Sequence, residues 1–267
     1  MDNQIVFILC LTFIIHLITT LAYSVRIVGT RTGKIFIAAS LFNILALSSR
    51  VASSAQGPLL AKYVEGELVA SSLSTATANF RWILLATTLA TAVGIAMMPT
   101  FQRSFGKVVE GFDIYRSVPR LLLHGFSKSG IYHLRTSVAI PSTTNLGSWR
   151  AVRRLPFRLL VANTLIEALF IVGAFAALYA GYLEPELRLT AVSLSPVITG
   201  IATIVLFLFI NPYLSIMTDD VLKGETSQLY LTRIVALLVG SRLAGTILAQ
   251  IMLVPAAYLI IAIAELL

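Results

Sequence analysis

The first apolar stretch of the chain, residues 5–23, reads IVFILCLTFIIHLITTLAY and contains one histidine and no charged side chain. About 20 consecutive apolar residues in a helix are enough to cross a bilayer. The residues before this stretch include Asp2 but no lysine or arginine, so they lack the basic region of a cleavable signal peptide. We therefore expect residues 5–23 to form a transmembrane helix that stays in the mature protein.

Five further apolar segments follow along the chain. The second span is expected to end before Arg50, the third at Pro99 and the fifth at the Asn211-Pro212 pair. The last segment is too long for one span, so we expect a tilted or broken helix that crosses at 243–264, with two crossings as the alternative. The sequence thus predicts spans over 35–49, 68–98, 159–183, 189–210 and 229–267.

Composition places the chain in the membrane class. Of its 267 residues, 57% are hydrophobic and 12% are charged, and the mean hydropathy is +0.89. Soluble domains carry about 25% charged residues, which coat their solvated surface. We therefore predict an all-α, polytopic membrane protein of about six transmembrane helices, with a basic, amphipathic cytoplasmic segment.

The distribution of basic residues predicts the orientation of the chain. The predicted loops on one side hold fourteen of the 20 lysines and arginines, and those on the other side hold four. Because cytoplasmic loops are enriched in these residues, we expect the N-terminus outside. The predicted units are a first membrane unit at 1–99, a basic cytoplasmic or interfacial segment at 100–158 and a second membrane unit at 159–267.

The two membrane units could be related to each other. Residues 20–29 (TLAYSVRIVG) and 164–173 (TLIEALFIVG) are identical at five of ten positions. Two three-helix units in succession must cross the membrane in opposite directions, which is the arrangement of inverted repeats in transporters. Such a repeat would place a binding site near the middle of the membrane, between the units.

The basic segment combines a helical apolar pattern with many cations. Apolar residues from Phe101 to Phe112 recur at helical spacing, with charged residues mostly on the other side, as in a helix on a membrane surface. We expect anionic membrane lipids as partners of this segment. They would either anchor the segment to the membrane surface or be phosphorylated lipids whose headgroups the segment collects. Nucleic acid is disfavoured, because the basic patch is attached to a membrane bundle. A second basic cluster comprises Arg150, Arg153, Arg154 and Arg158.

Motifs of catalysis are absent from the sequence. Residues 29–34 (GTRTGK) resemble a phosphate-binding loop but are one residue short, and Ile35 stands where serine or threonine would bind magnesium. The chain has no zinc-protease, nucleophile-elbow or dinucleotide-binding pattern, and its three histidines are far apart. We therefore expect no enzyme activity, no cofactor and no metal site.

Ionisable residues within or beside the predicted spans are the main functional signal. A central arginine or glutamate costs at least ~2.5 kcal/mol to insert, so it normally faces protein or water. Arginine bonds phosphate oxygens in a fork and stays charged, and no predicted span contains lysine. We infer a cationic cavity for an anionic substrate. Its expected substrate-binding residues are Arg26, Arg50, Arg81 and Arg242, and its expected coupling or gating residues are His16 and Glu167.

Structural alternatives exist for several of these residues. Arg26 and Arg81 could extend their side chains to the membrane surface. His16 could be a neutral core histidine, and Glu167 could serve only to pair with an arginine. The arginines nevertheless outnumber the one acid, which favours an anion from outside the chain.

Two stretches of the first membrane unit carry a family resemblance. One is HLITTLAYSVR at 16–26, followed by GTRTG at 29–33, and the other is SLFNILALSSR at 40–50, followed by QGPLL at 56–60. Together they resemble the Amj family, the alternate lipid II flippases of bacteria, and the length and hydropathy profile are similar over the whole chain. The resemblance implies a protein of the bacterial cytoplasmic membrane that moves lipid II from the inner to the outer leaflet.

The physics of that substrate agrees with a cationic cavity. Lipid II carries a diphosphate and a bulky polar head, and moving two negative charges outward across 100 mV gains ~4.6 kcal/mol. Alternating access without nucleotide is therefore our hypothesis. The alternatives are a carrier for undecaprenyl phosphate or another anionic lipid, an enzyme of the lipid carrier cycle, and a non-transporting scaffold for envelope assembly. Because six helices are few to enclose such a headgroup, a homodimer is considered beside a monomer.

Overall fold

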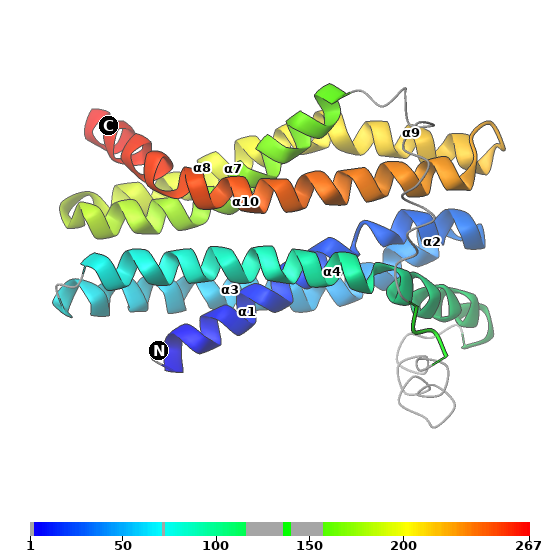
Figure 1. Ribbon diagram of the computed structural model, residues 1–267, viewed down its shortest axis with the longest axis horizontal. Helices are drawn as coiled ribbons and strands as arrows, with labels where there is room; N and C mark the ends of the chain where they lie inside the picture. The colour runs from blue at the N-terminus through cyan, green and yellow to red at the C-terminus, as the bar shows by residue number, and fades with distance from the viewer. Residues whose placement is uncertain (1–2, 71–72, 116–135, 140–156) are drawn as a thin grey trace.

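The computed structural model is a bundle of long helices (Figure 1), described for residues 3–70, 73–115, 136–139 and 157–267. Within these residues six segments are helical, long and apolar enough to cross a membrane, and no strand is found. The predicted all-α, multi-pass membrane fold is thereby confirmed. The elements are α1 (Asn3–Leu21), α2 (Ser24–Thr32), α3 (Ile35–Ala70), α4 (Leu73–Tyr115), α7 (Phe157–Leu183), η3 (Pro185–Leu187), α8 (Arg188–Val205), η4 (Leu206–Ile210), α9 (Asn211–Leu222) and α10 (Gln228–Leu266).

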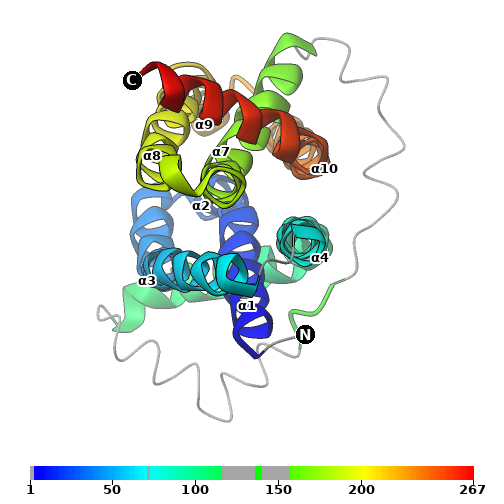
Figure 2. The same ribbon diagram turned by 90° about the vertical axis from the view of Figure 1, so that its left-hand side faces the viewer.

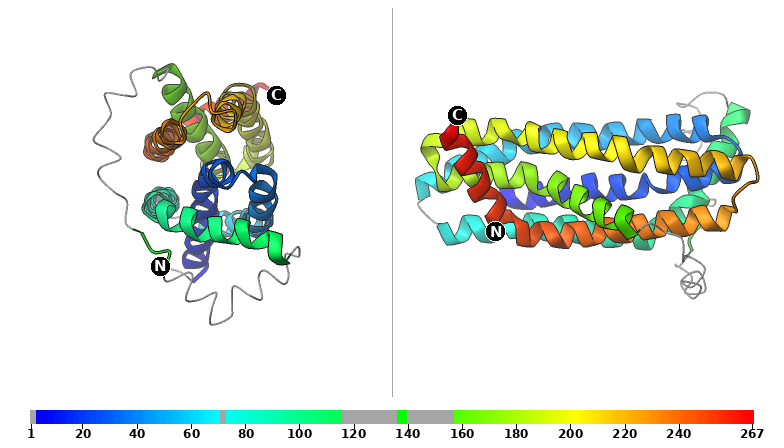
Figure 3. Two further views of the ribbon diagram at one scale, coloured as in Figure 1. Left: turned by 90° about the vertical axis from the view of Figure 1, so that its right-hand side faces the viewer. Right: turned by 90° about the horizontal axis from the view of Figure 1, so that it is seen from above.

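The helices form two layers that correspond to the two halves of the chain. α1 to α4 make the first layer and α7 to α10 the second (Figure 1). In the first layer α1 packs against both α3 and α4, and in the second α7 packs against both α8 and α10. Across the layers, α8 lies over α3 and α10 lies over α4 (Figures 2 and 3). The division at 1–99 and 159–267 and the inverted repeat stay predictions.

Several predicted helix ends are wrong because the helices run through them. α3 continues through Arg50 and Pro58, and α4 continues through Pro99. The π-helical turn η4 joins α8 to α9 across Asn211. Proline removes one backbone hydrogen bond, but membrane helices tolerate it because neighbouring groups satisfy the carbonyl that it leaves.

The last apolar segment forms one helix, α10, of 39 residues. At 1.5 Å per residue it extends about 58 Å, more than the thickness of a bilayer. Pro255 lies inside it, and its C-terminal part bends away from the bundle axis (Figure 1). The alternative of two crossings in this segment is therefore wrong.

The amphipathic pattern at 101–112 lies in the last turns of α4 and not in a separate helix. Phe101 and Phe105 stack with ring centroids 5.1 Å apart, and each meets Phe42 of α3 edge-on at 6.3 Å. The intervening Arg103 is exposed. The apolar side of this helix therefore packs on α3. Outside the described residues lie Arg150, Arg153 and Arg154.

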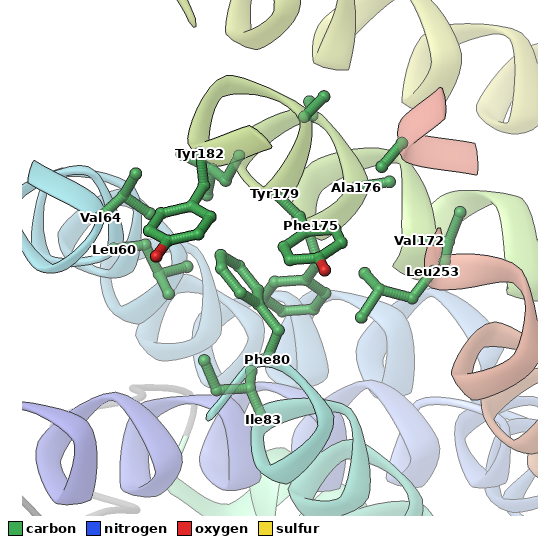
Figure 4. Packing of buried hydrophobic residues seen from close by; sticks show 14 of the residues in the cluster. Leu60, Val64, Phe80, Ile83, Val172, Phe175, Ala176, Tyr179, Tyr182 and Leu253 are labelled. Carbon is green, nitrogen blue, oxygen red and sulfur yellow. The ribbon is translucent and has the colours of Figure 1, made fainter. Parts of the chain in front are cut away.

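The largest apolar cluster joins the two layers at one end of the bundle (Figure 4). Phe80 of α4 is fully buried, and its ring lies 5.5 Å from that of Tyr179 on α7, which stacks on Tyr182 at 6.5 Å. Leu60 of α3 and Leu253 of α10 belong to the same cluster. Close packing of this kind holds membrane helices together, because lipid is as apolar as their side chains. The two layers are thus tightly joined at this end.

Candidate functional site

A cavity of about 250 Å³ lies between the two layers. Among the elements that line it are α2 and α9, which lie toward the end of the bundle opposite the apolar cluster (Figure 1). The α1–α2 junction and α7 and α10 complete its walls. Its polar lining residues are Thr19, Tyr23, Arg26, Glu167, Asn211 and Arg242.

Backbone irregularities flank the cavity in both layers. In the first layer the helix is interrupted at Ala22 and Tyr23, between α1 and α2, and both residues line the cavity. In the second layer the π-helical turn carries two lining residues, Leu206 and Ile210, and Asn211 follows it. Interrupted helices at membrane depth occur where the backbone lines a cavity or is buried in protein. Since π-helical turns are also frequent at functional sites, this region is the leading candidate for a site.

An ion pair between Glu167 on α7 and Arg242 on α10 forms part of the cavity wall. Arg242 Nη1 donates to Glu167 Oε2 at 2.6 Å. The side chain of Arg242 is 8% exposed and that of Glu167 is 6% exposed. The hydroxyl of Tyr23 donates to the other carboxylate oxygen at 3.0 Å. Arg242 Nη2 donates to Thr19 Oγ1 at 2.9 Å and lies 3.4 Å from His16 Nδ1. The pair thus belongs to the second layer but is bonded to three residues of the first.

The ion pair depends on a close approach of α7 and α10. A Cβ atom at Gly245 would lie 2.8 Å from the carbonyl oxygen of Thr164 and 2.9 Å from Cβ of Glu167, so a larger residue cannot fit without movement. Near this crossing the Asn163 amide donates to the Ser241 hydroxyl at 2.7 Å. Small residues at a crossing let two membrane helices approach closely. Gly245 therefore sets the spacing at which the carboxylate and the guanidinium meet.

Arg26 of α2 lines the same cavity and is half-buried. Its Nη1 donates to the Ser215 hydroxyl on α9 at 3.2 Å. No acidic side chain within 4 Å of its guanidinium is found in the described part of the chain. The charged lining therefore consists of two guanidinium groups and one carboxylate, which leaves a net charge of +1.

The structure brings four of the predicted site residues together. Arg26, Glu167 and Arg242 line the cavity, and His16 is buried behind Arg242. These residues come from both layers, so their convergence depends on the packing of the whole bundle.

Two predicted site residues lie elsewhere. Arg50 on α3 and Arg81 on α4 are exposed, and neither lines this cavity. The roles assigned to them from the sequence stay predictions.

Three polar residues of the cavity wall were not predicted from the sequence, namely Thr19, Tyr23 and Asn211. A signal for two of them is present, since His16, Thr19, Tyr23 and Arg26 are spaced by three, four and three residues. That spacing places them on one face of a helix. The stretch is a polar face in an otherwise apolar span, and it points into the interface between the layers.

Comparison with known proteins identifies the family. A family model described as "Amj: Alternate to MurJ" matches residues 11–264. The chain belongs to the Amj family. The lipid II flippase Amj of Bacillus subtilis (strain 168) is 37% identical over 259 residues, which cover 97% of this chain and 96% of that protein. No solved structure matches the chain.

The cavity of this Amj-family protein is suited to an anion. A guanidinium binds two phosphate oxygens through parallel hydrogen bonds. Arg26 makes one hydrogen bond to a neutral hydroxyl, whereas Arg242 is held by Glu167 and Thr19. An entering anion would therefore meet Arg26 first and reach Arg242 by displacing Glu167. The described residues contain no group of three His, Cys, Asp or Glu side chains that could hold a metal ion.

Proposed function

We propose that this protein is a lipid II flippase, which moves the undecaprenyl-diphosphate-linked peptidoglycan precursor from the inner to the outer leaflet of the bacterial cytoplasmic membrane. Membership of the Amj family and the name of the Bacillus subtilis relative support the substrate. The observation that carries the mechanism is the cavity between the layers, where Arg26 and Arg242 outnumber Glu167. The protein acts as a transporter and not as an enzyme.

We assign the basic end of the bundle to the cytoplasm and the N-terminus to the outside. The last turn of α2 carries Arg31, the connection to α3 carries Lys34, and Lys223 follows α9. These three residues lie at the end of the bundle nearest the cavity, and cytoplasmic loops are enriched in lysine and arginine. The cavity then lies on the cytoplasmic side of the apolar cluster, as in an inward-facing state of a transporter. The exposed Arg103 and Arg158 at this end contact anionic lipid headgroups.

The cavity accommodates the diphosphate and not the whole headgroup. Its volume of about 250 Å³ is at the low end for a small-molecule pocket. Arg26 captures one phosphate, and Arg242 binds the second when Glu167 is displaced. Glu167 and His16 then couple the binding of the anion to movement of the layers. A membrane potential of 100 mV contributes ~4.6 kcal/mol to outward movement of two charges.

Reconstitution of the purified protein tests this function directly. Proteoliposomes with labelled lipid II and an inside-negative potential should show movement of the label to the opposite leaflet. Arg26→Ala should slow that movement about tenfold or more, as expected for the loss of a charge-assisted hydrogen bond, while Arg103→Ala, which lies outside the cavity, should not. Movement of undecaprenyl phosphate without lipid II would favour the carrier alternative. Release of phosphate would indicate an enzyme, and no movement of either lipid would indicate a scaffold.

A further inference from the structure

One face of α3 carries a polar stripe that is uncovered in the described protein. We define the polar stripe as Ser40, Asn43, Arg50, Ser54 and Glu65, all of which are exposed. With 3.6 residues per turn, these positions fall within an arc of about 80° around the helix, which they share with the exposed apolar residues Phe36 and Leu47. The stripe is unusual because α3 is long and apolar enough to cross a membrane, and polar residues in such helices normally face protein or water.

Arg50 lies near the middle of the long apolar segment of α3. It is 15 residues after Ile35 and 16 residues before Gly66, the limits of the segment of α3 that is long and apolar enough to cross a membrane. At 1.5 Å per residue, these distances are about 22 Å and 24 Å. No acidic side chain within 4 Å of Arg50 is found among the residues that the structure describes. A guanidinium that lies within the hydrocarbon in such a segment requires water or an anion beside it.

The polar stripe faces the second layer. At its far end, Glu65 Oε1 lies 3.6 Å from Nη2 of Arg188, the first residue of α8. The views along the bundle agree, because α8 lies over α3 on one side of the molecule (Figures 2 and 3). We call the boundary between these two helices the α3–α8 seam. Asn43, Arg50 and Ser54 lie in the same arc of α3 as Glu65, so the stripe lies on the side of α3 that carries this contact with α8.

The α3–α8 seam is joined at one end only. There Leu60 of α3 and Ala191 of α8 belong to the same apolar cluster. Toward the other end, the buried residues of α3 and α8 belong to separate clusters, represented by Phe42 and Ala202. Apart from the Glu65–Arg188 pair, no side-chain hydrogen bond or ion pair between the two helices is found in the described residues. The seam is therefore the weakest boundary between the layers.

An apolar groove between α3 and the last turns of α4 lies beside Ser40, at the end of the stripe away from Glu65. It has a volume of about 230 Å³, and its lining includes Phe36, Ser40, Ile44 and Phe112. Phe36 is 87% exposed and Ile44 is 40% exposed, so hydrocarbon from the membrane has access to the groove. A polar path that begins beside an apolar groove matches the chemistry of a lipid with a large polar head.

Resting on the proposed function, we propose that the α3–α8 seam is the lateral opening of the flippase and that the polar stripe is the path of the substrate headgroup. The substrate class is an anionic, sugar-bearing lipid, whose phosphate contacts Arg50 at mid-membrane while its tail remains in the bilayer. The cavity is too small for the sugars and peptide, and the seam provides the space they require. The Glu65–Arg188 pair closes the outer end of the path until the headgroup leaves.

Cysteine labelling tests whether the stripe faces water. Cys10 is the only cysteine of the chain and is exposed, so a Cys10→Ser protein provides a blank background. Single cysteines replace Asn43, Arg50 or Ser54, and matched controls replace Ser48 and Ala55, which are also exposed but lie about 140° and 100° round the helix from Asn43 and Ser54. A charged, membrane-impermeant thiol reagent should label the stripe positions several-fold faster than the controls. Equal labelling of stripe and control positions would overturn the proposal.

Protection and transport measurements identify what occupies the stripe. Lipid II in the vesicles should slow labelling of the stripe cysteines, and phosphatidylglycerol at the same concentration should not. Equal protection by both lipids would show a general anionic-lipid surface instead. Spontaneous linkage of two chains through a cysteine at position 50, without labelling, would show an interface between copies. Either result overturns the headgroup path.

Substitution of the stripe gives the transport readout. Arg50→Gln should lower the rate of lipid II movement about tenfold, with partial rescue by Arg50→Lys, and Asn43→Leu should also slow it. Ser48→Leu, the matched control, should leave the rate unchanged. Equal transport by all four variants would overturn the path. If the wild-type protein moves no lipid II at all, the proposed function fails, but labelling of the stripe still decides whether the seam is hydrated.

Discussion

The two long boundaries between the layers differ in how they are held. Where α4 meets α10, the Gln250 amide donates to the carbonyl oxygen of Arg81 at 3.2 Å, and Phe80 and Leu253 share a buried cluster. Where α3 meets α8, one half-exposed ion pair at a single end is the side-chain bond found among the described residues. The difference supports the proposed lateral opening along the α3–α8 seam, with the α4–α10 boundary as the pivot.

A covalent tether across the α3–α8 seam should have the largest effect on the rate of lipid II movement. In the Cys10→Ser background, Glu65→Cys and Arg188→Cys place two thiols at the end where the wild-type side chains lie 3.6 Å apart. A reducible bismaleimide between them should stop lipid II movement almost completely, because the layers can no longer part there. Cleavage of the linker should restore the movement in the same vesicles.

The control for the tether lies within one layer. Lys107 of α4 donates to the Thr136 hydroxyl at 3.2 Å, and both residues are exposed, so cysteines at these two positions can be linked by the same reagent. With this linker intact, the rate of lipid II movement should equal the rate measured after the linker is cleaved. Equal inhibition by both tethers would contradict opening at the α3–α8 seam.

The next largest effect concerns the buried ion pair at the centre of the bundle. Arg242→Met leaves the Glu167 carboxylate buried without its cation, and it should lower the free energy of unfolding by about 3–5 kcal/mol. Adding Glu167→Gln removes the uncompensated charge, so the double variant should recover most of that loss. Thermal unfolding of the purified protein in detergent measures both changes. A double variant as unstable as Arg242→Met would show that the charge is not the cause.

A change confined to the second layer should have a smaller effect. Gly245→Ala introduces a Cβ atom 2.8 Å from the Thr164 carbonyl oxygen and 2.9 Å from Cβ of Glu167. Overpacking of this kind costs about 1–3 kcal/mol, and it should push α7 away from α10. Gly240→Ala on the same helix meets nothing within 4 Å and should stabilise the helix by about 0.5–1 kcal/mol. The same unfolding assay should therefore give opposite signs for the two alanines.

The smallest effect is expected for one hydrogen bond between the layers. Tyr23→Phe removes the hydroxyl that donates to Glu167 at 3.0 Å, while the carboxylate keeps its bond to Arg242. The free energy of unfolding should fall by about 1 kcal/mol. Tyr258→Phe, at an exposed tyrosine of α10, should change it by much less. If the two variants unfold alike, Tyr23 does not join the layers.

The spans could be predicted from the sequence, but several of their limits could not. Long apolar runs identify membrane helices because the bilayer sets their length. Pro58, Pro99 and Pro255 are poor markers of helix ends in this protein, because membrane helices accommodate proline where soluble ones break. The ends depend on packing against neighbours, which a single sequence does not display.

The candidate site was predictable in its residue types and not in its arrangement. An acid and several arginines at membrane depth indicated an anion site, yet Glu167 and Arg242 are separated by 75 residues and His16 and Arg242 by 226. Only the packing of the first layer against the second, and of α7 against α10, brings them together. Arg50 had the same sequence signal as Arg242 but lies on a different surface, because charge and depth do not encode which face of a helix is covered.

The π-helical turn η4 makes the cavity wall sensitive to the type of helix at this point. A π-helical turn bonds across five residues instead of four, so it holds one residue more than a continuous α-helix needs. Conversion of this turn to a regular α-helix with all its residues kept would rotate α9 by about 100° relative to α8, and Leu214 would then leave the cavity. Deletion of one residue between Leu206 and Ile210 would instead remove the extra residue and leave Leu214 in place. The turn therefore sets which face of α9 lines the cavity.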